Sequence, residues 1–77
     1  MADIATNIYE FRLKCGYTQK ELADMLGVSV QTISKWERGA SAPDISVLPK
    51  IAGVFHISID ALFGMDTKTD AIEWTNV

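Results

Sequence analysis

Residues 18–39 read TQKELADMLGVSVQTISKWERG, and this stretch contains two consecutive helix starts separated by one glycine turn. Thr18 can cap a first helix, because Glu21 three residues later completes a capping box with it. Gly27 supplies the left-handed conformation that ends this helix, and Ser29 offers the cap of a second helix immediately afterwards. The pattern predicts two short helices that a tight turn holds at a fixed, steep angle.

The second predicted helix has a narrow apolar face and a broad outward face. Ile33 and Trp36 are at inward spacing, and the opposite face carries Val30, Gln31, Ser34 and Lys35. In the major groove of DNA an amide can pair with adenine N6 and N7, and an ammonium group can pair with guanine O6 and N7. The composition of the outward face therefore predicts contact with DNA bases.

The first residue of the first predicted helix is Gln19. The free backbone N–H groups and the dipole of a helix start favour an anion, so Gln19 is expected against a DNA phosphate. Such a contact sets the register of the protein on the duplex and reads no sequence.

From about Ile8 to Gly64 the sequence resembles the phage-repressor and Cro-like helix-turn-helix domains, often called the XRE family of bacterial regulators. The motifs that carry the resemblance are T-Q-x-E-L-A-x-x-L-G-V-S, S-K-W-E-R-G, P-D and F-x-I-S-I-D-x-L-F-G. The resemblance implies an all-α, five-helix lambda-repressor-like fold with the helix-turn-helix at the second and third helices. It also implies binding to a palindromic operator as a two-fold dimer, and we expect a transcriptional repressor.

The resemblance assigns roles to individual positions. The positions that match base-facing sites are Val30, Gln31, Ser34 and Lys35. The predicted phosphate-facing set comprises Gln19, Thr32 and Arg38, with the two helix caps Thr18 and Ser29. Arg12 and Glu37 match a structural ion pair between the first and third helices. Because many relatives have a polar residue where this chain has Val30, we expect contact with a thymine methyl group there in place of a hydrogen bond.

The remaining sequence predicts three further helices. An apolar stripe indicates a first helix that ends at Gly16, with the inward residues Ile4, Ile8, Phe11 and Cys15. Ser46 is the expected cap of a fourth helix, which tolerates Pro49 in its first turn and buries Leu48, Ile51, Ala52 and Phe55. His56 is expected in a left-handed conformation, and Ser58 is expected to cap a short fifth helix ending at Gly64.

Length and charge are compatible with one small domain. The chain has 77 residues, a net charge of −3 and a pI near 4.8. Residues 12–50 carry six basic and four acidic side chains, a net charge of +2, so the remaining residues carry −5. We expect weak, salt-sensitive non-specific DNA binding, with residues 1–64 as the DNA-binding domain and residues 65–77 as a tail that is flexible or contacts the dimer partner.

Three residues of the chain allow both a structural and a functional interpretation. Cys15 is expected to be a small buried hydrophobe and not a redox or metal site, and one histidine, His56, makes no metal site. Trp36 is expected to pack in the core, with stacking on DNA as the alternative. We expect no cofactor, no enzymatic activity and, since no signal peptide or membrane span is present, a cytoplasmic protein. The alternative function is an antitoxin or adaptor module that holds a protein partner through its tail.

Overall fold

The structure is a computed structural model, and it describes residues 3–65 of the chain. Within these residues it contains the five expected helices and one additional 3₁₀ helix. Their bounds are Ile4–Cys15 (α1), Gln19–Leu26 (α2), Val30–Arg38 (α3), Ile45–Val47 (the 3₁₀ helix η1), Leu48–Phe55 (α4) and Ile59–Leu62 (α5). The predictions for the tail from residue 66 onward lie outside the described residues.

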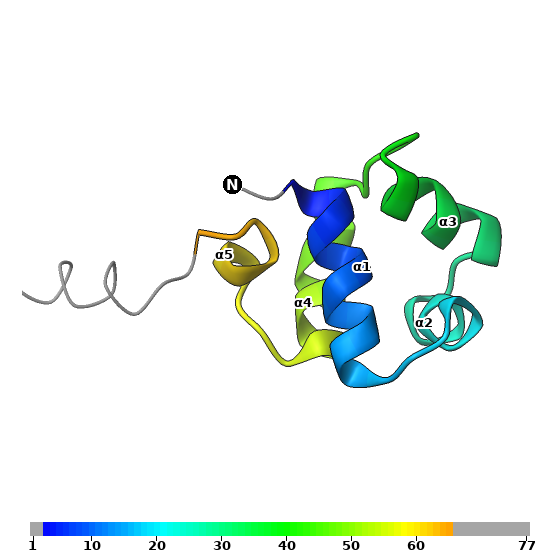
Figure 1. Cartoon of the computed structure of the whole chain (residues 1–77), viewed down its shortest axis with the longest axis horizontal. Coiled ribbons are helices and arrows are strands. Elements are labelled where there is room, and N and C mark those ends of the chain that lie inside the picture. The colour runs from blue at the N-terminus through cyan, green and yellow to red at the C-terminus, as the bar shows by residue number, and fades with distance from the viewer. Residues whose placement is uncertain (1–2, 66–77) are drawn as a thin grey trace, which may run out of the picture.

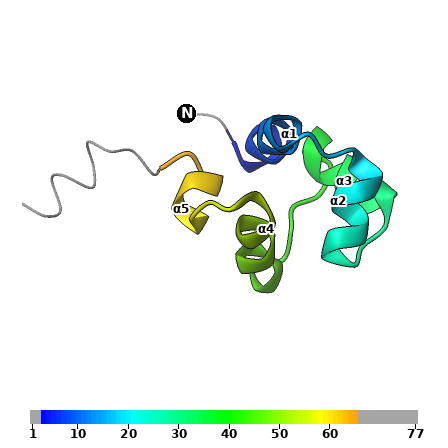
Figure 2. The ribbon, with the colours of Figure 1, turned by 90° about the horizontal axis from the view of Figure 1, so that it is seen from below.

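The helix α1 crosses the middle of the described domain and contacts α3, α4 and α5 (Figure 1). The pair α2 and α3 lies at one end of the domain and α5 at the other, in this view and in the view turned by 90° (Figure 2). The helix-turn-helix pair is therefore supported from one side by α1, and α2 also contacts α4.

The ends of α2 and α3 follow the expected chemistry. Thr18 and Glu21 form the complete capping box at the start of α2, and the Ser29 side chain accepts a hydrogen bond from the backbone of Thr32 at the start of α3. Gly27 has a φ of 73°, a left-handed conformation that ends α2 and leaves only two residues before α3 begins. The short turn thus fixes the relative direction of the two helices.

The start of α4 differs from the prediction. Ser46 does not cap this helix; it lies within η1, and Asp44 accepts hydrogen bonds from the Ser46 backbone N–H and hydroxyl. The helix α4 then continues directly from η1 without a side-chain cap, with Pro49 in its first turn as expected. Asp44 lies two residues before Ser46, and its carboxylate accepts the hydrogen bonds at the first turn of η1. Asp44, and not Ser46, is therefore the capping residue of this segment.

The core is a single apolar cluster to which all five helices contribute. Its buried members are Ile8, Leu22, Ala23, Leu26, Ile33, Trp36, Leu48, Ile51, Phe55 and Leu62. Trp36 is 5% exposed, which confirms the packing interpretation of this residue. Cys15 is half-buried against the same cluster, as expected for a small hydrophobe. Phe11 stacks on Phe55 with a distance of 5.9 Å between ring centroids, and this contact joins α1 to α4.

Two details at the ends of α4 and α5 confirm the sequence analysis. His56 ends α4 in a left-handed conformation, with a φ of 59°. Ser58 caps α5 by accepting a hydrogen bond from the Ala61 backbone N–H. The helix α5 itself ends at Leu62, two residues before the expected Gly64, which has a left-handed φ of 74°. In the part of the chain that the structure describes, no helix is both long enough and apolar enough to cross a membrane.

Candidate nucleic-acid interface

The four predicted base-contacting residues lie on one side of α3. Gln31 and Lys35 are exposed, Val30 is 38% exposed and Ser34 is half-buried. The opposite side of the same helix is buried, because Ile33 is fully buried and packs in the core beside Trp36. The packing of α3 against the core therefore leaves the polar side chains of Gln31 and Lys35 accessible to solvent.

An ion pair attaches α3 to α1. Arg12 Nε lies 2.6 Å from Glu37 Oε2, and Arg12 Nη2 donates to Glu37 Oε1 at 3.1 Å. Arg12 Nη1 also donates to the carbonyl oxygen of Tyr17 at 2.9 Å, so the guanidinium joins α1, α3 and the residues before α2. The hydrogen bond to Glu37 raises the pKa of Arg12 above its ordinary value. The expected pair between Arg12 and Glu37 is present, and its bidentate geometry restricts the rotation of α3.

Gln19 belongs to the same network, which the sequence analysis did not predict. Its Nε2 atom donates to Glu37 Oε1 at 3.0 Å, and the side chain is half-buried. The first residue of α2 is thereby connected to the last turn of α3. The amide oxygen and the second amide hydrogen of Gln19 are not used in this bond.

The remaining predicted phosphate contacts surround the starts of α2 and α3. Thr18 and Ser29 are exposed caps, and Thr32 is half-buried. The Ser29 and Thr32 hydroxyl oxygens lie 2.9 Å apart and share a hydrogen bond. The Thr18 hydroxyl accepts the Glu21 backbone N–H, so its own proton is available for another partner such as a phosphate oxygen. The Ser29 hydroxyl accepts the Thr32 backbone N–H, and because it also shares a hydrogen bond with the Thr32 hydroxyl, only one of these two hydroxyl protons remains available.

A hydrogen bond within α3 is also absent from the sequence analysis. Arg38 Nε donates to the Ser34 hydroxyl oxygen at 3.2 Å. The signal was available in the sequence, since residues four apart on a helix are neighbours. The sequence analysis gives Ser34 and Arg38 separate roles, and the structure places them in contact.

The exposed charge of α3 is positive. Lys35 and Arg38 are exposed, whereas the carboxylate of Glu37 is paired with Arg12. Because this pairing neutralises the only acid of the helix, the accessible face of α3 presents cations alone to the solvent. Such a face attracts the phosphate backbone of DNA despite the negative charge of the whole chain.

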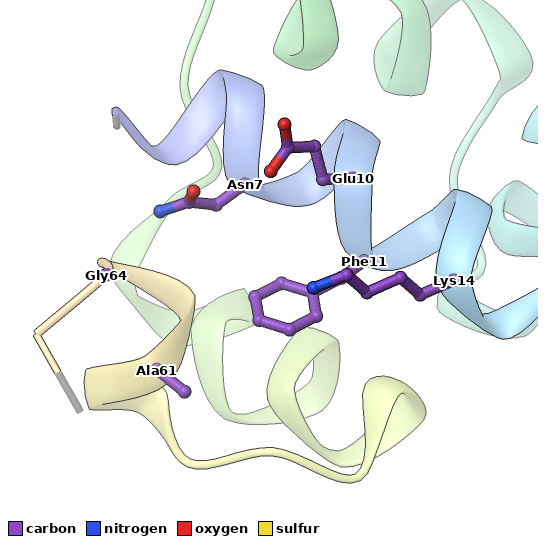
Figure 3. A pocket seen from close by; sticks show the side chains of 6 residues that line it. All are labelled: Asn7, Glu10, Phe11, Lys14, Ala61 and Gly64. Carbon is purple, nitrogen blue, oxygen red and sulfur yellow. The ribbon is translucent and has the colours of Figure 1, made fainter. Parts of the chain in front are cut away.

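A small pocket lies at the other end of the domain, between α1 and α5 (Figure 3). Its volume is about 260 Å³, and it is lined by Asn7, Glu10, Phe11, Lys14, Ala61 and Gly64. Asn7, a buried polar residue that the sequence analysis did not single out, donates to the carbonyl oxygen of Leu62 at 2.9 Å and connects the two helices. Among residues 3–65 no group of His, Cys, Asp and Glu side chains is arranged to hold a metal ion.

Comparisons with known proteins agree with this geometry. A family model described as helix-turn-helix matches residues 8–62. An HTH-type transcriptional regulator of Archaeoglobus fulgidus is 46% identical over 63 residues, which cover 82% of this chain and 90% of the relative. The HTH-type transcriptional regulator ImmR of Bacillus subtilis is 36% identical over 63 residues, and the matched part spans half of its length.

A solved structure extends the comparison to the fold. The crystal structure of the P22 c2 repressor in complex with a synthetic operator aligns with a TM-score of 0.78 at 30% identity, covering 86% of this chain and all of that one. The compared proteins are two transcriptional regulators and a repressor. With its capped α2 and α3, its short glycine turn and these matches, the chain belongs to the helix-turn-helix, or XRE, family of DNA-binding transcriptional regulators.

Proposed function

We propose that this protein represses transcription by binding a palindromic operator as a homodimer, with α3 in the major groove. Gln31 would pair with adenine, donating to N7 and accepting from the N6 amine, and Lys35 would donate to guanine O6 and N7. Ser34 would make a further polar contact, and Val30 would contact a thymine methyl group. The observation that carries the proposal is the exposure of Gln31 and Lys35 on a helix whose other side is buried and ion-paired.

The network around Glu37 supports a rigid mode of reading. Arg12 and Gln19 both hydrogen-bond to Glu37, so α1, α2 and α3 are connected at one point. A helix held in this way does not have to be ordered when DNA binds, and its base contacts keep one register relative to the phosphate contacts.

The phosphate contacts would come from the start of α2, the start of α3 and the end of α3. The proposed set is Thr18, Gln19, Ser29, Thr32 and Arg38. Along the chain these groups precede, interrupt and follow the proposed base-facing residues, and they would position α3 without reading sequence.

The dimer would place two copies of α3 on one side of the duplex. Two half-sites would then lie about 34–36 Å apart, or a multiple of that distance. The P22 c2 repressor is a structural relative that binds operator DNA, and this supports the same class of ligand here. In this proposal residues 1–64 form the DNA-binding unit.

The test is selection of binding sequences from a randomised DNA duplex pool at roughly physiological salt. The wild type is compared with the double variant Gln31→Ala/Lys35→Ala, and we expect a palindrome that only the wild type enriches. Lys14→Ala is the charge-matched control for Lys35→Ala, because Lys14 is exposed on α1, where its ammonium lies over the Phe11 ring and lines the distant pocket.

The controls separate sequence reading from charge. Lys14→Ala is expected to select the wild-type palindrome with nearly unchanged affinity, whereas Lys35→Ala is expected to lose preference at one base pair of each half-site. A folded wild type that enriches no sequence would contradict the proposed function. An enriched site without two-fold symmetry would contradict the dimer but keep the role of α3.

A further inference from the structure

We propose that Arg38 is a positioning residue that makes the Ser34 hydroxyl a hydrogen-bond donor toward DNA. The base facing Ser34 would then offer an acceptor in the major groove, which means guanine O6 or N7, adenine N7 or thymine O4, and cytosine with its N4 amine would be excluded. This inference rests on the proposed function and specifies the kind of base edge that one residue of α3 reads.

The geometry of one turn of α3 carries the inference. Arg38 Nε donates to Ser34 Oγ at 3.2 Å, and Arg38 follows Ser34 by four residues, so the two side chains share one face of the helix. A helical serine commonly donates its proton to the carbonyl oxygen one turn earlier. Within residues 3–65 Ser34 makes no such bond, and its proton therefore has no acceptor among these residues.

The chemistry of a hydroxyl group then sets the direction of the contact. A hydroxyl has one proton and two lone pairs, and a cationic N–H occupies a lone pair of Ser34. A hydrogen bond from a charged donor is stronger than a neutral one, which favours this orientation. The guanidinium also repels a second donor, such as the amine of cytosine, from the same oxygen. The proton of Ser34 is left to meet an acceptor.

Arg38 can keep this role while it contacts a phosphate. A guanidinium has five N–H donors, and the bond to Ser34 uses only the one at Nε. The four N–H groups on Nη1 and Nη2 remain for a phosphate oxygen, the contact already proposed for this residue. One side chain would thus connect a phosphate, which fixes register, with the hydroxyl that reads a base.

The experiment compares the selected sequences of the wild type, Ser34→Ala, Arg38→Lys and the double variant. Lysine keeps the charge and can contact a phosphate, but it has no N–H at the position of Nε. We expect the wild type to exclude cytosine at one position of each half-site. In both single variants the frequency of cytosine at this position, relative to the other bases, should rise by about threefold to tenfold, the usual contribution of one hydrogen bond. The double variant should lose no more than either single variant, since both remove the same contact.

Three readouts decide the outcome. Arg38→Lys should keep most of the affinity and the preferences read by Gln31 and Lys35, and its thermal midpoint should match the wild type. The inference is wrong if Arg38→Lys retains the full preference at the position that Ser34→Ala changes, if Ser34→Ala changes no position, or if the wild type selects cytosine there. These results would leave the palindrome intact, whereas a wild type that selects no sequence would overturn the proposed function and this inference together.

Discussion

The two ends of the domain are stabilised in different ways. Around α2 and α3 the contacts are directional: a capping box, a bidentate ion pair and an amide all fix orientation. Around α4 and α5 the contacts are mainly apolar, with Ile51 and Leu62 fully buried. There α4 begins without a side-chain cap and ends at a left-handed His56, and Gly53 lies in its interior.

The difference follows from what each end has to do. A helix that reads bases must keep its polar groups within hydrogen-bond distance of fixed partners, and this requires directional contacts. A supporting helix only has to fill volume, so residues that cost about 1 kcal/mol, such as a helical glycine, are tolerated. We therefore expect damage to α4 to lower stability, and damage at Glu37 or Arg12 to lower stability and DNA binding together.

The largest expected effect is from Ile51→Ala in α4. Ile51 is fully buried, and removing its side chain would lower the free energy of unfolding by about 4 kcal/mol through lost burial and the cavity left behind. Urea denaturation measures this change. Ile45→Ala is the matched control, because Ile45 is 80% exposed and its replacement is expected to change stability by less than about 0.5 kcal/mol.

Arg12→Met tests the end of the domain that contains α2 and α3, where the contacts are directional. Removing one partner of a buried ion pair leaves the other charge uncompensated, and we expect a loss of about 3 kcal/mol in unfolding free energy. Operator affinity should fall further than the folded fraction explains, because α3 is no longer held through Glu37. Fluorescence anisotropy with labelled operator, combined with urea denaturation, measures both quantities.

The matched control for Arg12→Met is Lys20→Met. Lys20 pairs with Asp24 at 3.2 Å, but the two side chains are 75% and 68% exposed. An exposed pair contributes roughly 0–1 kcal/mol, so stability should hardly change. Equal losses for both variants, or an Arg12→Met protein with unchanged operator affinity per folded molecule, would contradict the orienting role of the pair.

Gly53→Ala in α4 should raise the free energy of unfolding. A Cβ atom at Gly53 meets nothing within 4 Å, and alanine is favoured over glycine inside a helix by about 1 kcal/mol. Gly27→Ala should have the opposite sign, with a loss of about 1 kcal/mol, because a φ of 73° is strained for any residue with a side chain. Thermal unfolding of both variants is the measurement, and equal signs would refute the prediction.

The smallest expected effect is a pH dependence from two exposed caps, one at the start of α1 and one at the start of η1, which leads into α4. Hydrogen bonds from Thr6 lower the pKa of Asp3 at the start of α1, and hydrogen bonds from Ser46 lower the pKa of Asp44 at the start of η1. A carboxyl whose pKa is lowered on folding stabilises the fold above its ordinary pKa. This contribution is lost as the pH falls through the lowered value.

Asp3→Asn and Asp44→Asn measure these contributions separately. Each variant should show a weaker loss of stability between neutral and acidic pH than the wild type, and the double variant should show the weakest. Thermal midpoints recorded across that pH range give the comparison. A steeper acid dependence in either variant would be the wrong sign.

The helix-turn-helix was the most predictable part of the molecule. Thr18, Glu21, Gly27 and Ser29 act through neighbours within a few residues, so their roles could be read from the sequence. The apolar spacing of Ile33 and Trp36 likewise predicted the buried side of α3. The predicted cap at Ser46 was wrong because two capping groups, Asp44 and Ser46, stand close together, and local preference alone does not choose between them.

Local sequence thus determined the helices, the turn and the two sides of α3, because caps and periodicity depend on residues that are close along the chain. The tertiary structure decided which polar groups meet across elements. The bond from Gln19 to Glu37 and the bond from Asn7 to Leu62 join residues 18 and 55 positions apart. Such contacts depend on how whole helices pack, since packing brings distant side chains within hydrogen-bond distance and no local pattern encodes that distance.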